Sequence, residues 1–154
     1  MASGSSMNQP AATFAGRILV AAASYNDAIV DILLSGVRQG IGLDERELAS
    51  RVDVLRVPGS LEVPQALSLY AGNHSAMVGL GCVLRGETVH FDLVCRVCAE
   101  QLAALAAVTR IPVINGVLTC ESEAQARSRA GERGVEFGRS ASIMARLRED
   151  APDR

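Results

Sequence analysis

Short apolar runs alternate along this chain with segments whose apolar residues recur every three or four positions. Runs short enough to be buried strands cover residues 17–23, 52–57, 77–84 and 112–118. Helical periodicity follows over residues 29–38, 62–71 and about 88–108, and two further helices, split by Gly131, Gly134 and Gly138, are expected after residue 118. Strand–helix units repeated at this length predict an α/β fold, a parallel sheet with helices on both faces joined by right-handed crossovers.

Polar segments fall at the carboxyl ends of these strands, where open α/β sheets bind their ligands. They are Tyr25-Asn26, residues 58–62, residues 85–90 and Leu118-Thr119. We therefore expect the chemistry of this protein to lie along one edge of the sheet.

The segment after the third strand carries the strongest sign of a site. Arg85-Gly86 ends that strand, and Thr88 is a good N-cap for the helix that follows. Such a turn offers backbone N–H groups and the positive end of a helix dipole to an anion, and Arg85 adds positive charge. His90 would lie in the first turn, where the dipole favours a neutral imidazole that acts as a base. The alternative is that Glu87 and Thr88 only cap a helix and His90 is a surface residue.

Composition narrows the classes of function. Of the 154 residues 49% are hydrophobic, but there is no Trp and there are only two Tyr and three Phe, so Ala, Val, Leu and Ile must build the core. A net charge of −2 without a basic run gives no indication of nucleic acid or an anionic membrane. No apolar stretch is long enough to cross a bilayer and no signal peptide is recognisable, so we expect a cytoplasmic protein.

The chain length fits one domain, expected over residues 15–150. Residues 1–14 are expected to be a disordered segment. Its first part, Met1 to Met7, looks like the remnant of an expression tag followed by the natural start, and we leave it out of the fold.

Cys95 and Cys98 have the spacing of redox and zinc sites. They lie inside the long helix, however, and not at the helix N-terminus that lowers a thiol pKa. A zinc site would need two more ligands at a matching spacing. The other candidates, which are Cys82, Cys120, His74 and His90, do not have such a spacing. Buried free thiols in a reducing cytosol are the better interpretation, and we predict no metal.

The long helix is apolar on nearly all sides. Between Leu93 and Val108 only Arg96, Glu100 and Gln101 are strongly polar. A helix of this kind needs cover on more than one side. We expect a second copy of the chain to supply it, which predicts a homo-oligomer.

Five segments resemble, in order and spacing, the 6,7-dimethyl-8-ribityllumazine synthase family of riboflavin biosynthesis. They are Tyr25-Asn26, Val57 to Pro64, Gly81 to Phe91, Pro112 to Thr119 and Gln125 to Gly131, within a match from about Arg17 to Leu147. The resemblance implies a flavodoxin-like three-layer α/β/α sandwich with a four-stranded parallel sheet. It also implies pentamers, which can pack into sixty-subunit shells, with active sites between neighbouring subunits.

The reaction implied by the resemblance is a transferase condensation that uses no cofactor. It joins 5-amino-6-(D-ribitylamino)uracil to 3,4-dihydroxy-2-butanone 4-phosphate and gives 6,7-dimethyl-8-ribityllumazine, phosphate and water. The small-molecule substrates are the only ligands expected besides other copies of the chain.

The resemblance also implies roles for single residues. His90 stands where the family places its acid/base, and Glu87, Thr88 and Arg129 occupy its phosphate-binding positions. Tyr25 is implied to stack on the pyrimidine. Contacts to the ribityl chain are implied for Ser60, Leu61 and Glu62. Main-chain contacts to the uracil are implied for Cys82, Val83 and Leu84.

Three departures from the family pattern limit what is carried over. Asn115 stands where many members have an aromatic residue from the neighbouring subunit, so it can hydrogen-bond to the heterocycle but cannot stack on it. Ser24 replaces the usual Arg. The link expected between the last two helices is short, reading Gly131-Glu-Arg-Gly134, which favours a free pentamer over the shell.

Two other functions are compatible with this topology. One is a flavin- or nucleotide-binding module without catalysis, but neither G-x-G-x-x-G nor a Walker sequence occurs. The other is a shell protein whose catalytic residues are relics, against which the intact segment from Arg85 to His90 argues.

Overall fold

A four-stranded parallel sheet forms the centre of the computed structural model, which describes residues 13–153. Its strands are β1 (Ile18–Ala23), β2 (Val52–Val57), β3 (Ala76–Leu84) and β4 (Val113–Cys120). The spatial order is β2-β1-β3-β4, and each neighbouring pair is parallel. The four strands predicted from the sequence are therefore confirmed to within a few residues at each end.

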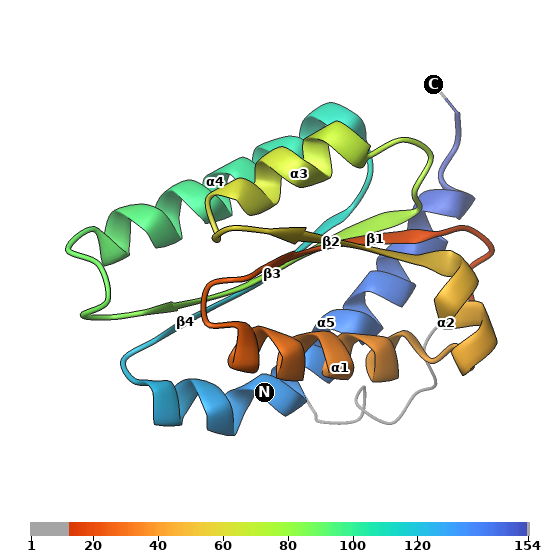
Figure 1. Cartoon of the computed structure of the whole chain (residues 1–154). Coiled ribbons are helices and arrows are strands. Elements are labelled where there is room, and N and C mark those ends of the chain that lie inside the picture. The colour runs from red at the N-terminus through yellow and green to blue at the C-terminus, as the bar shows by residue number, and fades with distance from the viewer. Residues whose placement is uncertain (1–12, 154) are drawn as a thin grey trace, which may run out of the picture.

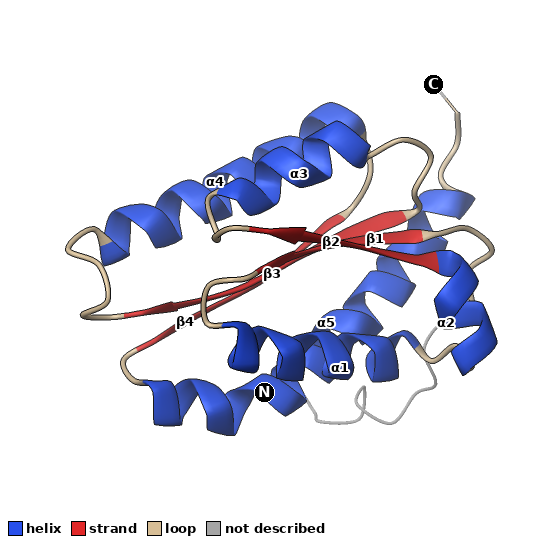
Figure 2. Ribbon diagram, viewed as in Figure 1, coloured by secondary structure: helices blue, strands red, loops and turns tan. Residues whose placement is uncertain are grey.

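Helices cover both faces of the sheet. They are α1 (Asp27–Ile41), α2 (Glu45–Arg51), α3 (Glu62–Tyr70), α4 (Phe91–Thr109) and α5 (Glu123–Asp150). The helices α3 and α4 lie on one face and α1 and α5 on the other (Figures 1 and 2). This arrangement is the flavodoxin-like three-layer α/β/α sandwich that the family resemblance implies. The short α2, capped by Asp44 through the backbone N–H of Glu47, was not expected.

Burial of the strands explains why they could be predicted from their apolar runs. Every residue of the central strands β1 and β3 is buried, whereas the edge strands β2 and β4 carry half-buried and exposed positions. The sheet separates two apolar clusters, one under α1 and α5 and one under α3 and α4. Strands covered on both faces read as continuous apolar runs, as parallel strands in α/β proteins do.

The two helices expected after β4 are in fact one continuous helix, α5. Its glycines do not break it, because they are contact points with α1. A Cβ on Gly138 would lie 2.1 Å from the carbonyl oxygen of Val37, and one on Gly134 would lie 2.5 Å from that of Leu33. The absent side chains let the two helix backbones touch, so the prediction of a break at these glycines was wrong.

The start of α4 also differs from the expectation. The helix begins at Phe91 and has His90 as its N-cap residue, without a side-chain capping bond. Thr88 is not the N-cap, although its hydroxyl accepts a hydrogen bond from the backbone N–H of His90 at 3.2 Å. His90 therefore precedes the first helical turn instead of lying within it.

Most of the expected disordered segment, residues 1–14, lies outside the described residues. Within its described end, Phe14 is only 6% exposed and packs into the cluster under α1 and α5. The guanidinium of Arg51 lies over the Phe14 ring, 4.7 Å from its centroid. Phe14, which the prediction assigned to the segment before the domain, thus packs against it.

Part of α4 lacks cover in the single chain. Only Cys98, Leu102 and Leu105 of this helix are buried, while Leu93 is 47% and Val108 is 83% exposed. Among residues 13–153 no helix is both long enough and apolar enough to span a membrane.

Candidate active site

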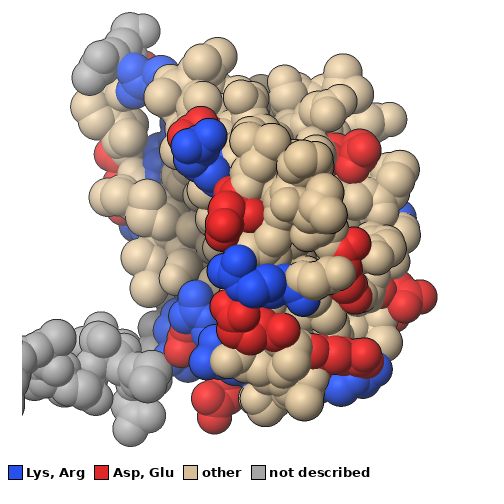
Figure 3. Space-filling model, turned by 90° about the vertical axis from the view of Figure 1, so that its left-hand side faces the viewer, with Lys and Arg blue, Asp and Glu red and all other residues tan. Residues whose placement is uncertain are grey.

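A pocket of about 230 Å³ opens at the carboxyl edge of the sheet, between the loops that follow β1, β2 and β3. Its lining residues are Tyr25, Gly59, Ser60, Leu61, Glu62, Cys82, Val83, Glu87, Thr88 and Val94. The left-hand side of Figure 1, which Figure 3 turns toward the viewer, is this edge of the sheet. On it acidic and basic side chains lie next to one another, without a large area of a single sign (Figure 3).

Hydrogen bonds hold the first two loops together. The backbone N–H of Ser24 donates to the carbonyl of Val57 at 2.7 Å, and that of Tyr25 donates to Pro58 at 3.1 Å. These bonds continue the pairing of β1 with β2 beyond the strands. Tyr25 is 58% exposed and lines the pocket, and an aromatic ring of this kind can stack against a flat ligand.

The loop after β2 is a tight turn that leads directly into α3. The N–H of Glu62 donates to Gly59 at 3.1 Å and that of Val63 to Ser60 at 3.3 Å. Ser60 fits over β3 only because Gly81 has no side chain, since a Cβ there would lie 2.5 Å from the Ser60 hydroxyl oxygen. The carboxyl group of Glu62, at a half-buried position, is thereby placed at the pocket as a hydrogen-bond acceptor.

The Cys98 thiol supports this turn from below. It donates to the carbonyl of Ser60 at 3.3 Å, and burial raises its pKa to about 11, so the thiol keeps its proton. Burial likewise raises the pKa of Cys82 to about 12, with Cys120 and acidic neighbours adding to the shift. Cys82 is therefore a neutral part of the pocket wall. The pKa of the half-buried Cys95 is also raised, mainly by burial.

The loop after β3 begins with a glycine turn. Gly86 has a φ of 93°, a left-handed conformation that favours glycine, and the N–H of Glu87 donates to Leu84 at 3.3 Å. The loop places Glu87 and Thr88 at the pocket, next to the N-terminus of α4. The positive end of the α4 dipole is therefore close to the pocket, as an anion site requires.

The positive charge that Arg85 was expected to add near the site is paired with two carboxylates. Its Nε lies 2.9 and 3.1 Å from the two carboxylate oxygens of Glu121, and its guanidinium is 3.6 Å from Asp92. It also lies over the ring of Phe91, 4.4 Å from the centroid. Arg85 instead links the loop after β3 to the loop after β4.

Four predicted site residues do not line the pocket. Leu84 is only 5% exposed and packs into the cluster under α1 and α5. His90 is exposed at the start of α4, and Asn115 is exposed on β4, where its side-chain oxygen accepts from the N–H of Val117 at 3.1 Å. Arg129 is exposed on α5 and forms no hydrogen bond or ion pair with another described residue.

Besides Gly59 in the turn before α3, two residues at the site were not assigned a role from the sequence. Val94 reaches the pocket from the first turn of α4, where its N–H donates to the carbonyl of His90 at 2.9 Å. The amide of Asn26 bonds to the carbonyl of Cys82 and to the carboxylate of Glu87. For Val94 the signal was its spacing four residues after His90, whereas Asn26 makes contacts that no local pattern reveals.

The described residues contain no group of three or more His, Cys, Asp or Glu side chains placed to hold a metal ion. All four cysteines are free. The chemical groups available at the pocket are thus an aromatic ring, two carboxylates, hydroxyls, backbone amides and the nearby imidazole of His90.

Comparison with known proteins identifies the family of this chain. A family model described as 6,7-dimethyl-8-ribityllumazine synthase matches residues 15–149. Proteins of that name from Xanthomonas campestris pv. campestris (strain B100) and Methylobacterium radiotolerans are 39% identical over 147 residues and 45% identical over 131 residues. These matches cover 88% and 84% of this chain, and 92% and 77% of the relatives. A relative of the same name from Thermococcus onnurineus is 41% identical over 133 residues, covering 83% of this chain and 86% of its own length. The chain belongs to the 6,7-dimethyl-8-ribityllumazine synthase family, whose members are transferases of riboflavin biosynthesis.

Proposed function

We propose that the pocket between the loops after β1, β2 and β3 is the active site of a 6,7-dimethyl-8-ribityllumazine synthase. In it 5-amino-6-(D-ribitylamino)uracil condenses with 3,4-dihydroxy-2-butanone 4-phosphate. The observation that carries this proposal is that one pocket collects Tyr25, residues 60–62 and residues 87–88 from three separate loops. Each set offers a group that one part of the substrates needs.

The pyrimidine substrate takes the inner part of this pocket. The Tyr25 ring stacks on the heterocycle, and the main chain of residues 82–84 bonds its polar edge. For Leu84 only the backbone takes part, because its side chain is buried in the core. The ribityl hydroxyls bond to Ser60, to the main chain of Leu61 and to the Glu62 carboxylate, an acceptor for several hydroxyl donors.

The ketone phosphate binds at the loop of Glu87 and Thr88, where backbone amides and the α4 dipole stabilise negative charge. Arg129 completes this phosphate site, and Asn115 bonds to the heterocycle. Both side chains are exposed and outside the pocket of their own chain, so we assign them to the pocket of a neighbouring subunit. The catalytic unit is then a pair of adjacent subunits.

His90 acts as the acid/base. Imine formation, loss of phosphate and ring closure each move a proton, and an imidazole gives and accepts protons near neutral pH. His90 follows Thr88 by two residues and is the N-cap of α4, which supports a role beside the leaving phosphate. Because the imidazole is exposed in the single chain, we propose that substrate and the neighbouring subunit enclose it.

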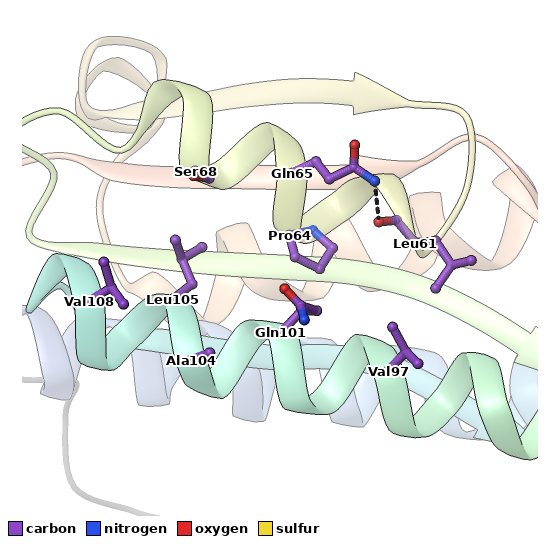
Figure 4. Close-up of a pocket in the computed structure, with 9 residues that line it drawn as sticks. All are labelled: Leu61, Pro64, Gln65, Ser68, Val97, Gln101, Ala104, Leu105 and Val108. Atoms are coloured by element: carbon purple, nitrogen blue, oxygen red, sulfur yellow. Dashed lines mark hydrogen bonds between the residues drawn. The ribbon is translucent and has the colours of Figure 1, made fainter.

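The surface of α4 supports an assembly. A groove of about 540 Å³ runs between α3 and α4, with mainly apolar and small side chains along its walls (Figure 4). Pro64 on α3 faces Gln101 and Leu105 on α4 across it (Figure 4). Together with the exposed Leu93 and Val108, the groove leaves apolar surface that a neighbouring subunit of a pentamer buries.

A free pentamer remains our choice over a sixty-subunit shell. Residues 131–134 lie within α5, so the chain has no loop at the position expected to influence packing between pentamers. We place the enzyme in the cytoplasm, where its four free thiols remain reduced. Light scattering tests the assembly, because a megadalton particle refutes the free pentamer and a fully active monomer refutes shared sites.

Turnover is tested by mixing the two substrates with the protein and following the absorbance of the lumazine product. Product formation supports the proposal. Tight riboflavin binding without any product favours the non-catalytic flavin-binding alternative. Sharing of the site is tested by co-refolding His90→Ala subunits with Arg129→Ala subunits: activity should partly return, because some interfaces then combine two intact halves.

A further inference from the structure

Asn26 departs from the usual behaviour of a helix N-cap residue. It precedes α1 with φ 58° and ψ 43°, and its side chain makes no capping hydrogen bond. An N-cap Asn normally accepts a hydrogen bond from the first helical turn. Among the described residues only one other non-glycine residue, Arg110, has a positive φ. The left-handed backbone, which Asn tolerates better than most residues, directs the amide away from α1.

The Asn26 amide connects two acceptors instead. Its Nδ2 lies 2.9 Å from the carbonyl oxygen of Cys82 and 3.0 Å from a carboxylate oxygen of Glu87. Both partners are acceptors, so the amide must present its nitrogen, and its two N–H groups serve one acceptor each. The Cys82 carbonyl belongs to the buried strand β3. The amide therefore fixes the Glu87 carboxylate relative to the sheet.

This contact matters because Glu87 brings a negative charge into a loop that is to bind an anion. A carboxylate free to rotate toward the phosphate subsite would repel a phosphate group at short range. The nearest basic residue in the sequence, Arg85, already pairs with Glu121 and Asp92. The Asn26 amide is the donor that holds this carboxylate in the described part of the chain.

We propose that Asn26 is a positioning residue for phosphate binding. It holds the Glu87 carboxylate away from the phosphate subsite, and it keeps the loop of residues 86–90 in the conformation that binds phosphate. The inference rests on the phosphate site proposed above. Asn26 acts through Glu87, so its effect depends on the charge of that side chain.

Two substitutions distinguish the role of the Asn26 side-chain amide from that of its left-handed backbone. Asn26→Gly keeps the left-handed conformation available and removes the amide, while Asn26→Asp keeps the size and replaces the donor with a second carboxylate. Inorganic phosphate, a product of the reaction, is titrated calorimetrically into the assembled wild-type protein and each variant. Loss of a hydrogen bond to a charged group predicts a phosphate Kd about tenfold higher in Asn26→Gly and higher still in Asn26→Asp.

Steady-state kinetics give the second measurement. The KM for the butanone phosphate should rise about tenfold in Asn26→Gly, while the KM for the pyrimidine changes less than about twofold. Asn73→Asp is the matched control, because Asn73 is an exposed residue of the α3–β3 loop, at the opposite edge of the sheet. It introduces the same charge change as Asn26→Asp and should leave phosphate binding unchanged.

A double-mutant cycle tests the dependence on Glu87. In a Glu87→Gln background the charge is gone, so adding Asn26→Gly should change the phosphate Kd by less than about threefold. Equal tenfold effects in both backgrounds would overturn the proposal, as would equal weakening of both substrates. If Asn26→Gly does not fold, the same cycle is measured with Asn26→Asp. This substitution should then raise the phosphate Kd more when Glu87 is present than in the Glu87→Gln background.

The wild-type protein separates this inference from the function on which it rests. A wild-type chain that binds no phosphate and makes no product refutes the phosphate site and the role of Asn26 together. A wild-type chain that does both, with Asn26 variants that bind phosphate equally well, refutes the role of Asn26 alone.

Discussion

The contact between α1 and α5 makes a strong prediction for a single methyl group. In Gly138→Ala the new Cβ would lie 2.1 Å from the carbonyl oxygen of Val37 and 2.9 Å from the backbone nitrogen of Ile41. Ordinary van der Waals contact begins at about 3.4 Å. Since both contacting atoms are backbone atoms, no side-chain rotation relieves the overlap, and the two helices must move apart.

The size of the effect follows from two opposing contributions. Overpacking a well-packed interior costs about 1–3 kcal/mol, and occasionally more. Against this, Ala is favoured over Gly inside a helix by about 1 kcal/mol. The distance is far below the van der Waals limit and both contacting atoms belong to the backbone. We therefore expect the cost of overpacking to reach or exceed the upper end of that range. Gly138→Ala should lower the free energy of unfolding by about 2 kcal/mol, or by more.

Gly131 supplies the matched control on the same helix. A Cβ there meets nothing within 4 Å, so Gly131→Ala gains the helix propensity without the overlap and should stabilise the protein by up to about 1 kcal/mol. Urea unfolding at one fixed protomer concentration measures both variants, because the stability of an oligomer depends on concentration. A Gly138→Ala variant as stable as the wild type would refute the argument that these glycines exist for helix contact.

Three further predictions concern the site and the opposite edge of the sheet. His90→Ala should lower kcat about a hundred- to ten-thousand-fold with the oligomer intact, and a fall of threefold or less would remove His90 from the mechanism. Arg129→Ala should raise the KM for the butanone phosphate about ten- to a hundredfold, with little change for the pyrimidine. Arg127→Ala, which loses only an ion pair to Glu123 within α5, is its control, and equal effects of the two would argue against Arg129 as the phosphate ligand. The third concerns Asp53, whose pKa is lowered, chiefly by the hydrogen bond from Arg17 and against the effect of burial. A pKa lowered by folding stabilises the protein above the unfolded pKa of about 3.9, and this contribution is lost as the pH falls through the folded pKa. Asp53→Asn should therefore lower the urea midpoint at pH 7 but not at about pH 2, and a pH-independent difference would contradict this.

The strands and the location of the pocket were predictable because they depend on local signals. Burial on both faces leaves a continuous apolar run in each central strand, and the carboxyl ends of parallel strands meet at one edge whatever the details of packing. Tyr25, Glu62 and Thr88 could therefore be placed near one another before the structure was known. The alternation of strands and helices was likewise sufficient to predict the three layers.

Other features depend on contacts between distant segments. Glycines inside a helical pattern indicate a break when they are read alone, but Gly134 and Gly138 face the backbone of α1, about a hundred residues earlier in the chain. The ion pair of Arg85 could not be predicted, because its partner Glu121 lies after the next strand. The sequence pattern also placed the start of α4 at Thr88, whereas the glycine turn delays it to Phe91.

The sequence by itself thus determined the α/β architecture, the edge of the sheet at which the candidate site lies, and the residue types that gather there. Only the tertiary structure decided which of those residues share one pocket, and that Asn26 holds Glu87 within it. The reason is that periodicity and turn preferences are properties of neighbouring residues, whereas a hydrogen bond such as that from Asn26 to Glu87 exists only once two distant loops have been brought within 3.0 Å.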